Sequence, residues 1–472
     1  LFINNNIHFL KSSIFAFYSI DVYMKIIIAG AGEVGYHLAK LLSFESQDIT
    51  LIDNNESSIN IAENKLDIKT IEGDSTSISV LKEANVQNSD LVVSLTSSES
   101  TNFTTCFLAK QLGAKRTIAR ISNVEFLESS NSIDFDSIGI DELISPENLA
   151  NEEIQHLINE SAFSTSHDFE HGILKMMGIK LEKNAPFIGK TVMEAASVFV
   201  GVNFMPIALK REDSETTIIP RGNTIFCESD QVYFITNKKG LNELYNLIGT
   251  VKQDINNVMI LGAGRVGSML AKDLSEKGLN IKLIEKNKIK ANNLAEDLKN
   301  VMILNVDGRN VDLLVEENLD NMDAFIASTG NSETNIMSCL MAKSKNIKKT
   351  IALVENMDYF NLSQSIGIDT LINKKLLAAN DIFKFVRKGE IVALAKLNDM
   401  DAEIVEFIVK ENSKVLNKKI VDLNFPLSAI IGGVIRSGKG LIVLGDFEIK
   451  IGDRVLVCST PDGLKKVESL FL

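Results

Sequence analysis

Short apolar runs alternate with amphipathic stretches along the first quarter of the chain. The apolar runs predict five strands, at residues 25–29, 49–52, 68–71, 91–95 and 118–121. Apolar residues at helical spacing between them predict helices that end near residue 42 and that cover about residues 77–84 and 98–112. The spacing Thr96-x-x-Glu99 predicts a capping box at the start of the last helix. Apolar strands that alternate with helices are typical of a parallel sheet covered on both faces.

The pattern changes after two helix-start signals. Ser145 followed by Pro146 predicts a helix to about residue 159, and Asn373 predicts a helix to about residue 388. The stretches that follow are β-rich with shorter periods, and each ends in a helical pattern, near residues 241–248 and 462–470. The order along the chain is therefore large α/β, small α+β, large α/β, small α+β.

The two large parts repeat each other. Gly262 lies 232 positions after Gly30, and Glu285 lies the same number of positions after Asp53. The matching segments include KIIIAGAGEVG with VMILGAGRVG, and ESTN with SETN. We therefore predict two Rossmann-like domains with doubly wound parallel sheets, each followed by a small α+β domain. The predicted boundaries are 24–145 and 255–373 for the large domains, and 146–250 and 374–472 for the linker helices with the small domains.

Charge and cysteine content exclude several kinds of partner and site. The chain of 472 residues has a net charge of −13, which argues against nucleic acid and against a polybasic membrane-docking patch. The four cysteines form no CxxC pair, so we predict no disulfide framework and no metal site; they are Cys106, Cys227, Cys339 and Cys458. No run of 18 apolar residues occurs, so no membrane-spanning helix is predicted.

Residues 1–23 contain no methionine, and the first methionine is Met24. The stretch shows neither a clear basic start nor the small-residue cleavage site of a signal peptide. We therefore expect an over-extended translation start, with the protein beginning at Met24, and we leave this stretch out of the fold prediction.

The first glycine motif carries the clearest chemistry. Gly30-x-Gly32-x-x-Gly35 follows a predicted strand and opens a helix, and Asp53 ends the next strand. The first glycine makes the tight turn, the second lets the backbone approach a pyrophosphate, and the third lets helix and strand pack closely. The helix N-terminus favours the phosphates, and an aspartate would accept hydrogen bonds from a ribose diol, which favours NAD over NADP. The candidate residues are Gly30, Ala31, Gly32, Glu33, Val34, Gly35 and Asp53.

The second glycine motif repeats this pattern with one change of charge. Its candidate nucleotide-binding residues are Gly262, Ala263, Gly264, Arg265, Val266, Gly267 and Glu285. Arg265 stands where the first motif has Glu33, and a cation beside phosphate acts differently from an anion. We therefore predict that the halves prefer different nucleotides, with Arg265 better suited to extra phosphate charge.

Further candidates end the third, fourth and fifth strands, where ligands bind in such sheets. Asp74 either faces an adenosine or forms a turn, and Thr96 with Ser97 either contacts ribose or caps the next helix. Arg120 is a candidate for phosphate or carboxylate, but Leu353 aligns with it in the second half. Any role of Arg120 is therefore confined to the first half.

Features of an enzyme are missing. A dehydrogenase needs a proton donor near the nicotinamide, and the small units are poor in such groups. No GxxxxGK[ST] or GxSxG motif occurs. The spacing of His167 and His171 suggests a metal pair, but no third ligand is evident. We therefore predict a protein that is not an enzyme and has no metal site.

The order of motifs resembles a known family. It runs KIIIAGAGEVG, LID with Asp53, IEGD with Asp74, SESTN, IARI with Arg120, LISPE, VMILGAGRVG, KLIEKN with Glu285, SETNIMSCLMAK and IKIGDRVLV. In this order the motifs resemble the TrkA family of Trk potassium-uptake regulatory proteins, from Met24 to Leu472. That resemblance implies two RCK-type units, each a nucleotide-binding domain followed by a small C-terminal domain.

The resemblance also implies ligands and partners. The family binds NAD(H) and in some members ATP or ADP, and it sits on the cytoplasmic side of the inner membrane as a peripheral subunit. Its partner is a potassium-translocating subunit of the TrkH/TrkG type. The family's nucleotide-contacting positions map onto Gly30 to Val34, Asp53, Thr96, Ser97, Arg120, Gly262 to Val266 and Glu285. Val306-Asp307-Gly308 departs from the family's Gly-Asp order at the third strand of the second half.

The expected mechanism is a population shift. Units assemble as a homo-oligomer, in a ring whose inter-unit angles change, and a nucleotide that fits one arrangement better favours it. The helices after Ser145-Pro146 and Asn373 are candidates for packing between units. An NAD-dependent oxidoreductase and a soluble redox or nucleotide sensor stay open as alternatives; the first predicts substrate-dependent oxidation or reduction of nicotinamide, the second no recovery from membranes.

Overall fold

The computed structural model describes most of the chain after residue 23. The described residues are 24–43, 47–128, 133–159, 163, 165–170, 172–197, 203–212, 214, 216–247, 254–355, 367–386, 391–397 and 400–471. The expectation about residues 1–23 and the position of His171 lie outside them.

The first large domain is a parallel sheet in the order β3-β2-β1-β4-β5-β6, which is the doubly wound order. Its strands are β1 (Lys25–Ala29), β2 (Asp48–Asp53), β3 (Lys69–Glu72), β4 (Leu91–Ser94), β5 (Arg116–Arg120) and β6 (Glu142–Ile144). Its helices are α1 (Glu33–Ser43), α2 (Glu56–Lys65), α3 (Ile78–Glu83), α4 (Glu99–Gln111) and α5 (Glu125–Glu128). The five predicted strands are confirmed, and β6 is an edge strand that the prediction missed.

The second large domain repeats this order as β14-β13-β12-β15-β16-β17. Its strands are β12 (Asn257–Leu261), β13 (Asn280–Ile284), β14 (Val301–Leu304), β15 (Ala324–Ala327), β16 (Lys349–Leu353) and β17 (Thr370–Ile372). Its helices are α9 (Arg265–Glu276), α10 (Lys288–Asp297), α11 (Val311–Glu316) and α12 (Ser332–Ser344). The predicted duplication of a Rossmann-like sheet is therefore confirmed.

Each small domain is built on an antiparallel sheet. The first has the order β10-β9-β11-β8-β7, and the second has the order β18-β19-β22-β20-β21. The first contains β7 (Thr165–Phe169), β8 (Leu174–Lys180), α7 (Val192–Ala196), β9 (Phe204–Lys210), β10 (Thr217–Ile218), β11 (Gln231–Thr236) and α8 (Lys238–Leu247). The second contains β18 (Ile391–Lys396), β19 (Glu403–Ile408), β20 (Ala429–Arg436), β21 (Lys439–Leu441), β22 (Arg454–Ser459) and α15 (Pro461–Phe471).

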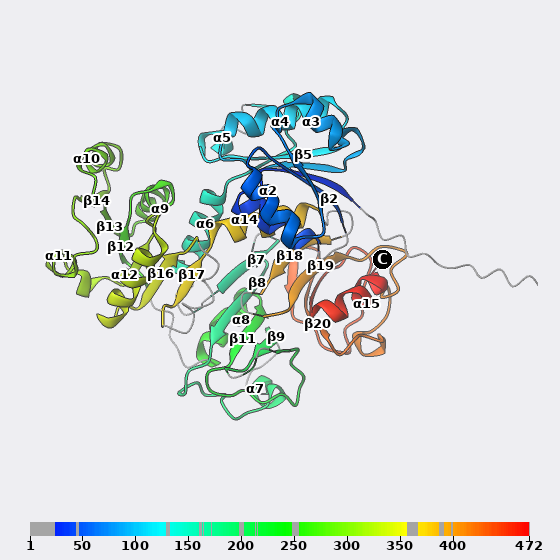
Figure 1. Cartoon of the computed structure of the whole chain (residues 1–472). Coiled ribbons are helices and arrows are strands. Elements are labelled where there is room, and N and C mark those ends of the chain that lie inside the picture. Colours follow the sequence, from blue (N-terminus) through cyan, green and yellow to red (C-terminus); the bar gives the residue numbers. More distant parts are fainter. Residues whose placement is uncertain are drawn as a thin grey trace, which may run out of the picture.

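The helix that leaves each large domain packs on the other large domain. Helix α6 (Pro146–Asn159) contacts α9, and α14 (Lys374–Val386) contacts α1, while α6 and α14 contact each other (Figure 1). Both begin as predicted, since the Ser145 hydroxyl accepts the Asn148 N–H and the Asn373 side chain accepts the Lys375 and Leu376 N–H groups. The two halves are therefore joined by an exchange of helices.

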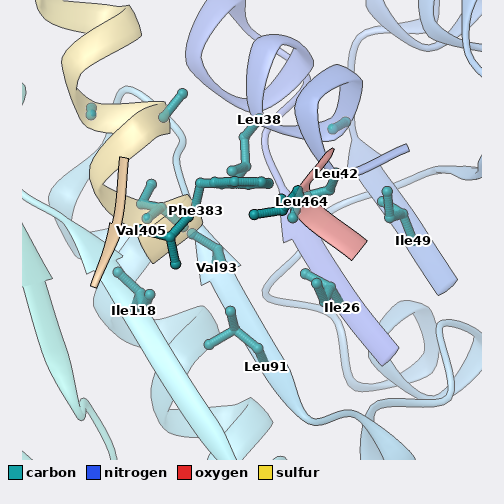
Figure 2. Close-up of a cluster of buried hydrophobic side chains, with 14 of the residues drawn as sticks. Ile26, Leu38, Leu42, Ile49, Leu91, Val93, Ile118, Phe383, Val405 and Leu464 are labelled. Carbon is teal, nitrogen blue, oxygen red and sulfur yellow. The ribbon is translucent and has the colours of Figure 1, made fainter. Parts of the chain in front are cut away.

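The packing of α14 on α1 is apolar. Leu38 and Leu42 on α1 are fully buried, and Figure 2 shows Phe383 of α14 beside Leu38. The packing of α6 on α9 adds polar contacts, because the Asp273 carboxylate accepts hydrogen bonds from Asn151 and Gln155. Because these apolar side chains are buried from water, the junction belongs to the hydrophobic core and is not a surface contact.

A cation at the start of the fifth strand holds the exchanged chain in each half. The Lys349 ammonium on β16 donates to the carbonyl of Phe163, which follows α6, at 2.6 Å. The matching residue of β5, Arg116, donates to the carbonyl of Phe385 in α14 and lies over its ring. Lys349 is buried (2% exposed), so its hydrogen bond is shielded from water.

Stability is expected to depend on the protonation of Lys349. Burial lowers the pKa of Lys349 from 10.5 to about 8. Between these values the folded chain loses the proton before the unfolded chain does, so the unfolding free energy rises with pH across this window. We expect the stability of the wild type relative to Lys349→Met to rise by on the order of 2 kcal/mol between about pH 7 and about pH 10. Urea titrations measure this, with the exposed Lys345→Met as control, and a pH-independent difference contradicts it.

Candidate functional site

The first glycine turn has the geometry that a pyrophosphate needs. Gly30 has a φ of +106°, and a Cβ there would lie 3.0 Å from the backbone of Leu95 and Thr96. A Cβ on Gly35 would lie 1.8 Å from the Gly30 carbonyl oxygen, so helix α1 can approach β1 only without a side chain there. A Cβ on Gly32 would meet no atom of the described residues within 4 Å, apart from its two chain neighbours. The space above Gly32 is therefore open beside the N-terminus of α1, where phosphates bind.

The second glycine turn repeats this geometry. Gly262 has a φ of +97°, and a Cβ on Gly267 would lie 2.0 Å from the Gly262 carbonyl oxygen. Among the residues that the structure describes, a Cβ on Gly264 would meet the Ser328 carbonyl oxygen alone, at an ordinary 3.7 Å. Ala31, Val34, Ala263 and Val266 pack into the hydrophobic cores, so at these positions only the backbone can face a ligand.

The acids that end the second strands lie differently in the two sites. The Asp53 carboxylate accepts the N–H of Ala31 in the glycine turn at 2.5 Å and the N–H of Asn55 at 2.8 Å. It therefore lies against the turn, where a ribose of a bound dinucleotide would be. The Glu285 carboxylate instead accepts the N–H of Asn287 at 2.8 Å and lies 3.6 Å from the Lys290 ammonium. This is a first structural difference between the sites.

A buried asparagine ties the ends of two strands together. The Asn102 side-chain oxygen accepts from the Ser94 hydroxyl and from the N–H and hydroxyl of Thr96, and its amide donates to the carbonyls of Thr96 and Arg120. Asn335 makes the matching bonds to Thr329 and to the Leu353 carbonyl. The sequence pattern predicts no role for these two residues, although each ends a repeated motif, STN in the first half and ETN in the second.

The predicted capping box at Thr96 is wrong. Ser98 is the N-cap of α4, and its hydroxyl accepts the Thr101 N–H. Glu99 instead accepts the N–H groups of Ser122 and Asn123 after β5. Thr96 is held by Asn102, and Ser97 is exposed beside it. Thr96 and Ser97 therefore do not cap α4, and contact with a ribose stays a prediction for them.

Arg120 ends β5 with an unsatisfied donor. Its Nε is buried and has no hydrogen-bond partner among the described residues. A buried donor that lacks a partner costs free energy, which a bound anion would recover. The aligned Leu353 is an apolar side chain, 5% exposed, so the second site lacks this donor.

The aspartates after the third strands form turns. The Asp74 carboxylate accepts the N–H and hydroxyl of Thr76, and these hydrogen bonds lower its pKa. Asp307 is paired with Arg309 at 2.6 Å, which lowers the pKa of Asp307 to about 2. The departure from Gly-Asp order therefore places an ion pair at the third strand of the second site.

These observations fit a dinucleotide or nucleotide in the first site. The open Gly32, the helix N-terminus and the unpaired Arg120 donor all suit phosphate, and Asp53 suits a ribose diol. Within the described residues, no group of three or more histidine, cysteine, aspartate or glutamate side chains is placed to hold a metal. No helix in the same residues has the length and apolar character needed to cross a bilayer.

The fold and the glycine turns define a protein with two Rossmann-type domains, each paired with a small domain. A family model of the TrkA-N domain matches residues 26–146 and 258–374, and a model of the TrkA-C domain matches residues 176–249 and 404–472. The chain is 31% identical over 459 residues to "Trk system potassium uptake protein TrkA homolog 1" of Methanosarcina mazei, which covers 95% of this chain and 100% of the relative.

A second relative gives the same result. The chain is 31% identical over 455 residues to "Trk system potassium uptake protein TrkA" of Haemophilus influenzae, covering 95% of this chain and 98% of the relative. The chain therefore belongs to the TrkA family of Trk-system potassium uptake proteins, which confirms the resemblance in the sequence.

Solved structures agree on the fold. The "GsuK RCK domain" matches with a TM-score of 0.59 at 16% identity, over 95% of each chain. The "GsuK channel bound to NAD" matches with a TM-score of 0.59 at 16% identity, over 95% of this chain and 79% of that chain. At this identity the likeness confirms the tandem RCK arrangement and carries no residue roles.

Proposed function

We propose that this chain is the nucleotide-binding regulatory subunit of a Trk-type potassium uptake system. The observation that carries the proposal is the pair of glycine turns, each with an open middle glycine at a helix N-terminus, in a chain of the TrkA family. A channel of the same fold has been solved bound to NAD, which supports nucleotide binding by this architecture.

The proposed ligands are NAD(H) and, in addition, ATP or ADP. In the first site the proposed contacts are the 30–35 turn with Asp53, Thr96, Ser97 and Arg120. Asp74 is proposed to shape this site through the turn that it forms with Thr76. In the second site they are the 262–267 turn and Glu285. Because the acids, Arg120 and the loop charges differ between the sites, we propose that the two sites prefer different nucleotides.

The proposed role is regulatory and not catalytic. A potassium-translocating membrane subunit of the TrkH/TrkG type is the proposed partner, on the cytoplasmic side of the inner membrane, with the chain in a ring-shaped homo-oligomer. The units of this assembly are the domains 24–145 and 255–373, with 146–250 and 374–472 attached to them. The exchange of α6 and α14 supports the proposal, since it joins the glycine-turn helix of each half to the other half.

Nucleotide binding is expected to be saturable and different at the two sites. Isothermal titration of the chain from Met24 with NADH, ADP and ATP is expected to show two classes of site, with dissociation constants that differ by at least about 5-fold for one of the nucleotides. Two identical affinity profiles would contradict the difference between sites. Absence of binding by all three nucleotides would contradict the proposed function.

A further inference from the structure

The second half of the chain places a lysine at the mouth of the first glycine turn. Lys375, in the first turn of α14, forms an ion pair with Glu33, the first residue of α1. The two residues are 342 positions apart in the sequence. Glu33 directly follows Gly32, above which the space is open. The Lys375 ammonium is therefore beside the place where the phosphates of a bound nucleotide would lie.

Lys375 belongs to a chain of charges that crosses from one half to the other. Glu355, which follows β16, lies 3.1 Å from the Lys375 ammonium and 3.2 Å from the Lys374 ammonium. The Lys374 ammonium in turn lies 3.3 Å from the buried carboxylate of Glu147 on α6. Burial raises the pKa of Glu355, but the two lysines outweigh it and hold that pKa below its usual value. Three carboxylates thus share two ammonium groups.

The exposed fractions of the paired side chains indicate which ion pair a phosphate could replace. The Glu33 side chain is 65% exposed, whereas that of Lys375 is 21% exposed and that of Glu147 is 5% exposed. Lys375 is thus largely buried and keeps its ion pair with Glu355 when Glu33 turns to solvent, which costs little free energy. A phosphate at the N-terminus of α1 would repel the Glu33 carboxylate and attract the ammonium that Glu33 holds.

We infer that Lys375 is a phosphate-binding residue of the first nucleotide site, supplied by the other half of the chain, and that Glu33 competes with phosphate for it. This inference rests on the proposed function and assigns a specificity residue within it. A nucleoside triphosphate, whose phosphate chain carries more charge than a dinucleotide, gains the most from Lys375. Its binding therefore depends on how α14 packs against α1.

The second site has the opposite arrangement of charge. Arg265 stands at the place of Glu33, so a cation is present in the glycine turn itself. The residue of α6 that matches Lys375 is Glu147, since each is the second residue of its helix. Its Oε2 is buried without a hydrogen-bond partner among the described residues. The second site thus has its cation in its own turn, and the position in the other half that matches Lys375 carries an acid. Dependence on a lysine of the other half is specific to the first site.

Titration of the full chain from Met24 with ATP and NADH tests the inference. Lys375→Met is expected to weaken ATP binding at one class of site by about 10-fold, and NADH binding by less than about 3-fold. Lys375→Arg is expected to keep ATP binding within about 3-fold of the wild type. Lys40→Met, an exposed lysine near the far end of α1, is the matched control and is expected to change neither affinity.

Glu33→Gln separates phosphate binding from a merely structural ion pair. Both Glu33→Gln and Lys375→Met break the pair, but only the first frees the ammonium, so it is expected to strengthen ATP binding about 3-fold. If Glu33→Gln and Lys375→Met weakened ATP binding equally, the inference would be overturned. It would also be overturned if Lys375→Met bound ATP as tightly as Lys40→Met. In both cases NADH binding would stay intact, so the proposed function would stand. A wild type that binds neither nucleotide would overturn the proposed function together with it.

Discussion

Replacing Gly32 by alanine is expected to remove nucleotide binding at the first site without loss of stability. A Cβ at this position meets none of the described atoms beyond its chain neighbours within 4 Å, so the folded chain has room for it. The same Cβ would occupy the space in which phosphate approaches the N-terminus of α1. Loss of charge-assisted hydrogen bonds to the backbone should weaken binding by roughly 10- to 100-fold. Isothermal titration with NADH measures the affinity.

Three further glycine variants make this result interpretable. Gly264→Ala is expected to act in the same way on the second site, since its Cβ would have an ordinary contact of 3.7 Å. Gly222→Ala, in the first small domain, has a nearest atom at 3.8 Å and is the control that should change nothing. Gly35→Ala should destabilise the chain, because its Cβ would lie 1.8 Å from the Gly30 carbonyl oxygen. If the double variant that carries both Gly32→Ala and Gly264→Ala bound NADH with full affinity, both proposed sites would be refuted.

Asn102→Ala is expected to destabilise the first large domain by about 3 kcal/mol or more. The substitution removes the side-chain oxygen that accepts the Thr96 N–H and the amide that donates to the carbonyls of Thr96 and Arg120. These backbone groups would be left without partners. Because Thr96 and Arg120 would lose their support, NADH affinity at the first site should fall as well. Hydrogen exchange of the amides in β4 and β5 measures the local effect.

The duplicated domain supplies the comparison for this variant. Asn335→Ala should raise exchange in β15 and β16 and leave β4 and β5 unchanged, since Asn335 makes its bonds within the second domain. Asn64→Ala, which removes a hydrogen bond within the exposed face of α2, should have little effect on either. If the amides of β4 and β5 were protected from exchange in Asn102→Ala as strongly as in the wild type, this network would not stabilise the strand ends.

The regular part of the fold was predictable because it depends on local pattern. Strands buried on both faces give continuous apolar runs, so β1, β4 and β5 were found within a residue or two. The edge strand β6 has three residues, of which only Ile144 is buried, and such a short, half-exposed run gives no distinct signal. The family and the doubled Rossmann arrangement followed from the motif order.

The parts that were not predictable depend on contacts between distant residues. The capping signal at Thr96 competes with the bonds that Asn102 makes from the next turn of α4, and pattern reading cannot rank the two. The loop charges suggested an acidic first site and a basic second site. The ion pair of Glu33 with Lys375 changes that interpretation, and it depends on α14 reaching across from the other half.

Purification of the tagged chain, beginning at Met24, from gently solubilised membranes of its source cells tests the central claim most directly. The account predicts that a polytopic potassium-translocating protein is recovered with it, and that NADH or ATP alters both the contact and the potassium flux of the reconstituted pair. Recovery of no membrane protein, or a potassium flux that neither nucleotide changes, would contradict a regulatory role in potassium uptake.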